Sequence, residues 1–170
     1  MYLLRHCQAA GTPPNAGDHD RPLTEKGAAD ALAMGRYLEK SGAAPELALC
    51  SSALRAQETI QNVAQAFAGG IGAKSERPLY TASAGGMLQS IHATGAEVTQ
   101  LLVVGHVPAI QELGIALCGG GNPQHRSAMA AGFPSGALAT LEFKADDWAG
   151  VGLRAGAIRG YTTPAQLPDA

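Results

Sequence analysis

The chain has 170 residues, of which 46% are hydrophobic and 15% charged, with a formal net charge of −2. That hydrophobicity with so little charge excludes a disordered chain, and the length fits a single domain over residues 1–170. The small negative charge, without a basic stripe, argues against nucleic acid as a main partner.

The chain carries no recognisable membrane or secretion signal. It has no apolar run of the roughly 20 residues that a spanning helix needs, so we expect no membrane partner. A charge already at Arg5 does not suit a signal peptide. The three cysteines, Cys7, Cys50 and Cys118, cannot all pair and form no C-x-x-C motif. Reduced thiols in a cytoplasmic protein are the simplest interpretation.

The first third of the chain alternates a strand, a loop and a helix. Residues 2–4 are apolar and predict a buried strand, whereas residues 7–23 are rich in Gly, Pro, Asn and Asp and predict a loop. Thr24 is placed to cap a helix that runs to Lys40. The buried face of this helix is expected at helical spacing, at Ala28, Leu32, Gly35 and Leu38.

A second strand, at residues 47–50, leads into a helix that Ser51 or Ser52 caps. The apolar face of that helix is expected at Ala53, Ala56, Ile60, Val63 and Phe67. Residues 78–80 are a candidate third strand, and residues 87–93 a short helix.

The clearest strand is at residues 101–104, whose continuous leucine and valine character suits burial on both faces. A further helix is patterned by Ile110, Leu113, Leu117 and Cys118 and closed by three glycines at 119–121. Residues 137–143 and 152–159 predict two last strands, the second at an edge. Alternating strands and helices predict an α/β fold in three layers, a mostly parallel central sheet with helices on both faces.

Arginines and histidines stand at the carboxyl ends of three predicted strands. Arg5 and His6 follow the first, Ser51 and Arg55 follow the second, and His106 follows the clearest one. Ligands of open α/β sheets bind outside the carboxyl ends of the strands, so these segments are expected to line one crevice.

This set of side chains suits phosphoryl transfer. Guanidinium groups match phosphate oxygens, and the start of the helix that carries Arg55 favours an anion. A neutral imidazole is a competent nucleophile toward phosphorus, and a second histidine, when protonated, can donate to the phosphoryl oxygens.

Four motifs together resemble the histidine phosphatase (phosphoglycerate-mutase-like) superfamily. They are Leu4-Arg5-His6, the segment from Asp20 to Gly27, the segment from Ser51 to Thr59, and the segment from Val104 to Pro108. The short length and the segment from Phe133 to Ala137 resemble its small SixA-type phosphohistidine phosphatase branch. The resemblance implies His6 as nucleophile, Arg5 and Arg55 as phosphate ligands and His106 as a further pocket residue, with no metal and no cofactor.

The sequence departs from the family pattern at three places. Cys7 replaces a glycine, either as a small packing residue, which we favour, or as a thiol near the pocket. Ser52 replaces a proline. Residues 80–89 contain no carboxylate, although larger members carry a glutamate general acid in this region.

The missing acid favours a phosphohistidine substrate, whose imidazole leaving group is weakly basic. We therefore expect a phosphorylated protein as substrate, or alternatively a small phosphate compound. The proton source is left open among Asp18, His19, Asp20 and His106. The candidate substrate-binding residues are Ser51, Asp18 and Asp20, although Ser51 equally suits a helix cap and Asp20 a loop anchor.

Other classes fit less well. A cysteine-dependent phosphatase needs C-x5-R spacing, and Cys50 precedes Arg55 by one position too few. A metal phosphatase needs a second ligand cluster beside His19 and Asp20. A dinucleotide site needs a Gly-rich turn after the first strand. The remaining non-enzyme alternative is a phosphate-binding module that has lost turnover.

Overall fold

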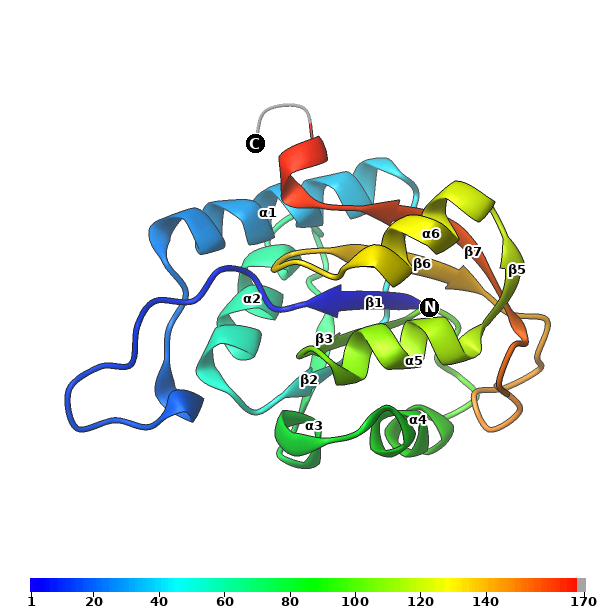
Figure 1. Ribbon diagram of the computed structural model, residues 1–170, viewed down its shortest axis with the longest axis horizontal. Helices are drawn as coiled ribbons and strands as arrows, with labels where there is room; N and C mark the ends of the chain where they lie inside the picture. The colour runs from blue at the N-terminus through cyan, green and yellow to red at the C-terminus, as the bar shows by residue number, and fades with distance from the viewer. Residues whose placement is uncertain (168–170) are drawn as a thin grey trace.

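A sheet of seven strands forms the middle of the molecule, in the order β3-β2-β4-β1-β6-β7-β5 (Figure 1). The computed structural model describes residues 1–167. Its strands are β1 (Tyr2–Arg5), β2 (Leu47–Ser51), β3 (Gly72–Glu76), β4 (Leu101–Gly105), β5 (Cys118–Gly121), β6 (Leu138–Glu142) and β7 (Gly156–Thr162). Its α-helices are α1 (Glu25–Lys40), α2 (Leu54–Ala64), α3 (Pro78–Thr81), α4 (Ala84–His92), α5 (Ala109–Leu117) and α6 (Pro123–Ala131), and two short 3-10 helices are η1 (Asp18–Asp20) and η2 (Pro164–Gln166).

The sheet is mixed rather than mostly parallel as the sequence predicted. Strand β6 runs antiparallel to both of its neighbours, β1 and β7, whereas the β1–β4, β2–β4, β2–β3 and β5–β7 pairs are parallel. The physical reason lies in residues 143–155, which join β6 to β7 without a helix. Without a crossover helix, the chain returns beside β6 in the opposite direction.

The sheet separates two hydrophobic cores, because alternate residues of a strand face opposite sides. Leu3 and Val103 pack in one core with the helices α3 to α6. Leu4 and Val104 pack in the other core with α1 and α2. The predicted three layers are therefore confirmed, with helices on both faces (Figure 1).

Helix α1 begins where the sequence predicts, since Thr24 Oγ1 accepts a hydrogen bond from the Gly27 amide at 2.9 Å. Gly35 lets α1 approach α2 closely, because a Cβ atom there would lie 2.4 Å from the Val63 carbonyl oxygen. The predicted buried face is half right. Gly35 and Leu38 are buried, whereas Ala28 and Leu32 are only half-buried.

Helix α2 is capped differently from the prediction. Its N-cap is Ala53, so neither Ser51 nor Ser52 caps it. Four residues of the predicted apolar face, Ala53, Ala56, Ile60 and Val63, are buried. The fifth, Phe67, lies beyond the end of α2 and is only half-buried, so this part of the prediction is wrong.

Five elements after α2 differ from the prediction. Residues 78–80 belong to the short helix α3, and the third strand is β3. The glycines 119–121, predicted to end a helix, lie in the edge strand β5. Strand β7 lies between β6 and β5 rather than at the edge, and α6 was not predicted. None of the helices in residues 1–167 is long and apolar enough to cross a membrane.

Candidate active site

The carboxyl ends of β1, β4 and β2 meet because these strands are parallel neighbours. Arg5 pairs with Gly105 across β1 and β4, and Cys50 pairs with Val104 across β2 and β4. The residues that follow these strand ends must then lie together. The His6 amide donates to the Gly105 carbonyl oxygen at 3.1 Å. This hydrogen bond fixes His6 beside the segment that carries His106.

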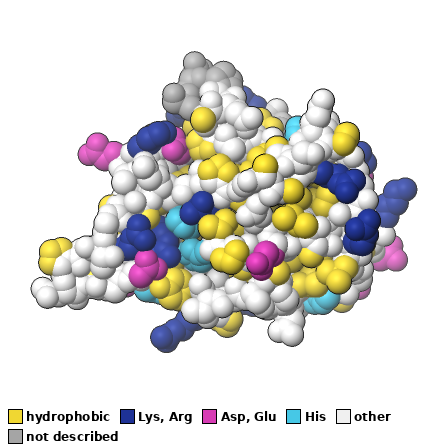
Figure 2. Space-filling model, viewed as in Figure 1, with side chains coloured by type: hydrophobic (Ala, Val, Ile, Leu, Met, Phe, Trp, Pro, Cys, Tyr) yellow, Lys and Arg dark blue, Asp and Glu magenta, His cyan; other side chains and the backbone are white. Residues whose placement is uncertain are grey.

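A pocket of about 550 Å³ opens at this edge of the sheet. Figure 2 shows Arg and His side chains gathered on the left of the molecule, next to the outlying loop. The residues that line the pocket come from several separate parts of the chain: Arg5, His6, Gln8, Ala9, Asp18, Arg21, Arg55, Tyr80, Thr81, His106, Val107 and Ser135. All four residues that were predicted to be catalytic are among them.

The His6 ring is held in its neutral form. Its Nδ1 lies 2.7 Å from the Cys7 carbonyl oxygen, and because a carbonyl only accepts, Nδ1 must carry a proton. In a neutral ring, the lone pair is then on Nε2. Burial, together with the charges of the nearby arginines, lowers the pKa of His6 to about 4. His6 is therefore neutral at pH 7, the state in which it can attack phosphorus.

His106 lies beside His6, with 5.0 Å between the ring centroids. Its Nε2 lies 2.7 Å from Ser51 Oγ, and its buried Nδ1 has no hydrogen-bond partner within residues 1–167. Burial, followed by the charges of His6 and Arg55, lowers the pKa of His106 to about 3. At pH 7 the second histidine is therefore neutral, not protonated.

The guanidinium groups of Arg5 and Arg55 differ in how many hydrogen bonds they donate within the protein. Arg5 donates from Nη1 to the Phe133 carbonyl oxygen at 3.0 Å, while its buried Nε has no partner within the described residues. Arg55 is 6% exposed and donates to Asp18 twice, from Nη1 to the carbonyl oxygen at 2.6 Å and from Nη2 to the carboxylate at 2.9 Å. Arg5 and His106, which both line this pocket, thus each have one buried nitrogen without a partner in the described residues.

The carboxylate of Asp18 accepts hydrogen bonds from three side chains. It accepts from Arg21 Nη1 at 2.9 Å, from the Tyr80 hydroxyl at 2.9 Å and from Arg55. Those hydrogen bonds hold the pKa of Asp18 well below its usual range, with the bond from Arg21 as the largest cause. Asp18 is ionised at neutral pH, so it has no proton to give, although the sequence left it open as a proton source.

Two of the predicted substrate-binding residues do not line the pocket. Ser51 is fully buried and touches His106 from behind the pocket wall. Asp20 is exposed and accepts hydrogen bonds from the Gly17 amide and from His19. These placements fit Ser51 as a support for His106 and Asp20 as the loop anchor that the sequence also allowed.

Arg21 and Tyr80 are among the pocket residues that the sequence prediction missed. Arg21 donates from Nε to the Ala10 carbonyl oxygen at 2.8 Å and so closes the base of the loop. The Tyr80 ring lies 5.7 Å from the His106 ring and 5.9 Å from the Arg55 guanidinium carbon. Arg21 was visible in the motif as a loop residue, whereas assignment of Tyr80 to a strand concealed its role.

Thr59 and Cys7 fix the backbone around His6. Thr59 Oγ1 accepts from the Cys7 amide at 3.0 Å and donates to the Arg55 carbonyl oxygen at 2.6 Å, which ties the segment that carries His6 to α2. Cys7 is fully buried and does not line the pocket. Burial raises the pKa of its thiol to about 12, so the packing interpretation of Cys7 is the one that fits.

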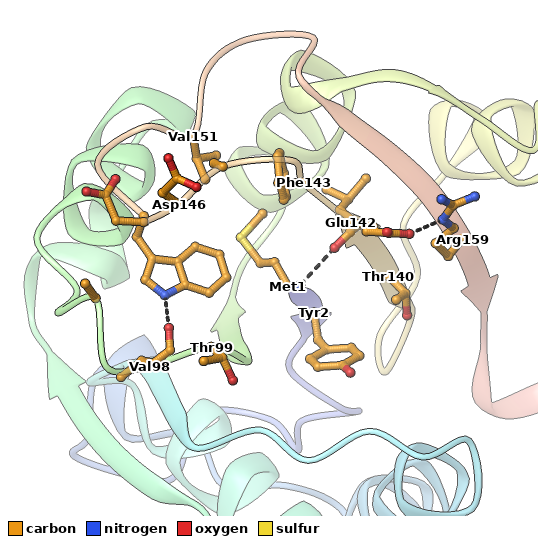
Figure 3. A pocket seen from close by; sticks show the side chains of 15 residues that line it. Met1, Tyr2, Val98, Thr99, Thr140, Glu142, Phe143, Asp146, Val151 and Arg159 are labelled. Carbon is orange, nitrogen blue, oxygen red and sulfur yellow. Dashed lines mark hydrogen bonds and ion pairs between the residues drawn. The ribbon is translucent and has the colours of Figure 1, made fainter.

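A second pocket, of about 420 Å³, lies at the opposite end of β1 and is unsuited to phosphate. It is lined by Met1, Trp148 and Phe143, with carboxylates at Glu142, Asp146 and Asp147 (Figure 3). Its one arginine, Arg159, is paired with Glu142. Residues 1–167 contain no group of three or more His, Cys, Asp or Glu side chains placed to hold a metal ion.

Comparisons with known proteins show which family the chain belongs to. The family model described as histidine phosphatase superfamily (branch 1) matches residues 1–77. An uncharacterized protein of Mycobacterium tuberculosis is 33% identical over 165 residues, which cover 95% of this chain and 99% of the relative.

Two solved structures are similar over nearly the whole chain. One, assigned as the phosphohistidine phosphatase SixA of Agrobacterium tumefaciens, is 30% identical with a TM-score of 0.80, and 96% of each chain is covered. The other, the protein histidine phosphatase SixA complexed with tungstate, is 25% identical with a TM-score of 0.77, again over 96% of each chain. This chain therefore belongs to the histidine phosphatase superfamily, in its SixA-type branch, and is a phosphatase.

Proposed function

We propose that this phosphatase removes phosphoryl groups from phosphohistidine in a protein, through a covalent phosphohistidine at its own His6. One observation carries the proposal. His6 is neutral, its Nδ1 is committed to the Cys7 carbonyl oxygen, and its Nε2 is left for a pocket that holds Arg5, Arg55 and His106. A nucleophile with a fixed lone pair, next to cations, suits phosphoryl transfer.

In the first step, His6 Nε2 attacks phosphorus and forms a P–N bond. The bond between phosphorus and the substrate nitrogen breaks, and the imidazole leaving group departs neutral, keeping its own proton and the electron pair of that bond. In the second step, water attacks phosphorus, the P–Nε2 bond breaks, and its electron pair returns to His6. Inorganic phosphate leaves and the neutral histidine is restored.

The side chains around the pocket serve these steps by position and charge. The guanidinium groups of Arg5 and Arg55 neutralise the phosphoryl oxygens, and the Cys7 carbonyl oxygen keeps the His6 ring in one orientation. Because the Nδ1 proton stays on the ring throughout, the attacking nitrogen needs no proton transfer.

The choice of a P–N substrate follows from the pocket carboxylates. Asp18 is the one carboxylate among the lining residues, and it is ionised and held by three donors. An alkoxide leaving group needs a proton in the transition state, a contribution of about 10²–10⁴ in rate. A protonated imidazole leaving group does not. The SixA relatives, described as phosphohistidine phosphatases, support the same substrate class.

A substrate series tests the proposal. Phosphoramidate, a phosphohistidine peptide, aryl phosphates and sugar phosphates are compared at one pH and salt concentration. We expect kcat/KM to fall steeply as the leaving group becomes more basic, with sugar phosphates slowest. Equal rates for sugar phosphates and phosphohistidine peptide would contradict the substrate class and indicate a small-molecule phosphomonoesterase. Binding of phosphate without any turnover would indicate a phosphate-binding module instead.

A further inference from the structure

Ser51 contacts the second pocket histidine from inside the protein. It is the last residue of β2 and is fully buried. The neighbouring pair Cys50 and Val104 places it next to the segment that leaves β4. Its Oγ lies 2.7 Å from His106 Nε2, within ordinary hydrogen-bond distance.

The hydrogen bonds of the Ser51 hydroxyl determine which atom donates. Its oxygen accepts from the Ala53 amide at 3.2 Å, which uses one lone pair and leaves the hydroxyl proton. Within residues 1–167, His106 Nε2 is the acceptor that this proton can reach. If Nε2 carried a proton instead, the Ser51 proton would be buried without an acceptor, which is costly. The hydroxyl therefore donates to Nε2.

A neutral imidazole has one N–H, so an accepting Nε2 leaves the proton of His106 on Nδ1. That Nδ1 is buried and has no partner within the described residues. We propose that Ser51 is a positioning residue that fixes His106 as the Nδ1–H tautomer, and thereby supplies a neutral donor for the transferring phosphoryl group. The tautomer stands on the hydrogen bonds alone, while its use on a phosphoryl group rests on the proposed function.

The fixed tautomer explains how an uncharged histidine can help bind an anion. Burial lowers the pKa of His106 to about 3, so protonation at neutral pH is not available to make a donor. The groups that face His106 come from every element around the pocket: His6, Arg5, Arg55, Asp18 and Tyr80. The Nδ1–H group of the fixed His106 tautomer is a donor without any change of protonation, so it is present throughout the neutral pH range.

The direct test is a long-range ¹H–¹⁵N correlation spectrum of histidine-labelled protein without substrate. The His106 signals are assigned by their loss in a His106→Asn variant. We expect a protonated Nδ1 and an unprotonated Nε2 in the wild type from pH 6 to 8, and an increased Nε2–H population in Ser51→Ala. A wild-type ring protonated on Nε2, or a Ser51→Ala spectrum identical to the wild type, would overturn the proposal. Neither outcome depends on phosphatase activity.

A double-mutant cycle tests the consequence for turnover. Removal of one preorganised donor costs about 10²–10³ in rate, and Ser51→Ala only redistributes the tautomers, so we expect kcat/KM to fall about tenfold. The matched control is Ser52→Ala, which removes the neighbouring hydroxyl from His19 and should leave kcat/KM unchanged.

The His106→Asn background separates positioning from packing. The asparagine amide nitrogen takes the place of Nδ1 and does not need Ser51 to hold its protons. In that background we expect Ser51→Ala to cost less than about twofold, since the two residues act as one unit. An equal loss in both backgrounds would show that Ser51 merely supports the fold. Thermal unfolding of each variant confirms that the compared proteins are folded.

Discussion

The Arg55 guanidinium group is hydrogen-bonded to Asp18 inside the pocket. Both terminal nitrogens of the guanidinium donate to this one residue, at 2.6 Å to its carbonyl oxygen and at 2.9 Å to its carboxylate. The same carboxylate accepts from Arg21 and Tyr80, so these hydrogen bonds hold η1 against Arg55. An incoming phosphoryl group meets a guanidinium that already faces a negative charge.

Asp18→Asn should therefore tighten the binding of inorganic phosphate. The variant removes a negative charge beside the anion site, an effect of about 1 kcal/mol, or roughly fivefold in the inhibition constant. Asp20→Asn is the matched control, because it removes the same charge from the same short helix away from Arg55. Weaker phosphate binding by Asp18→Asn would mean that Asp18 organises Arg55 instead of competing with the ligand.

Arg55→Lys should lower kcat/KM by about 10²-fold, because lysine keeps the charge but loses the planar fork that grips two phosphoryl oxygens. The control is Arg36→Lys, at an exposed position of α1, which should leave the rate unchanged. Steady-state kinetics with phosphoramidate measure both. Wild-type kcat/KM in Arg55→Lys would remove Arg55 from the list of transition-state ligands.

The pH dependence should be set by His6, which must be neutral to attack. Burial lowers its pKa to about 4, so kcat/KM should hold to well below the ordinary histidine pKa of about 6.5 and fall as the pH drops through about 4. An acid limb near pH 6.5 in the free enzyme would contradict the buried, arginine-surrounded His6.

Stability should depend on pH through the same groups. The folded-state pKa values of His6 and His106, about 4 and about 3, lie below the unfolded value of about 6.5. Their contribution is fully present above pH 6.5 and is lost as the pH falls through the folded values, because the unfolded state binds more protons. Denaturant unfolding of the wild type between pH 7 and 4 should show this loss, and His106→Asn should show a smaller one.

Chelation should leave the phosphatase rate unchanged. The positive charge that faces the phosphoryl group is expected to come from Arg5 and Arg55, so no divalent ion has a role to fill. Rates before and after dialysis against EDTA provide the comparison. Loss of activity that a divalent ion restores would refute the metal-free mechanism.

The sequence predicted the elements that carry their own signal. The strands β1, β2 and β4 are continuous apolar runs, α1 and α2 have helical periodicity, and the start of α1 is marked by its Thr24 cap. The edge strands β3 and β5 were not predicted because they lack a continuous apolar run. Strand β3 reads Gly-Ala-Lys-Ser-Glu and is largely exposed, and β5 is Cys-Gly-Gly-Gly.

The predicted strands indicated which residues would lie together in the candidate site, except for residues that distant segments bring to the pocket. His6, His106 and Arg55 could be placed together because each follows a strand end or opens the next helix. Tyr80 and Arg21 reach the pocket from α3 and the loop after η1, through contacts between distant segments that no local pattern encodes. Ser51 was visible as a polar residue at the right place, but its position behind His106 depends on the sheet register.

The covalent intermediate is the central claim, and trapping it is the most direct test. The enzyme is mixed with phosphoramidate, quenched within milliseconds at alkaline pH to preserve the P–N bond, digested and analysed by mass spectrometry. We predict one phosphoryl group on His6, its absence together with loss of turnover in His6→Ala, and normal labelling and turnover in the control His125→Ala on α6. A phosphoryl group on another residue, or substantial turnover by His6→Ala, would contradict the assignment of His6 as nucleophile.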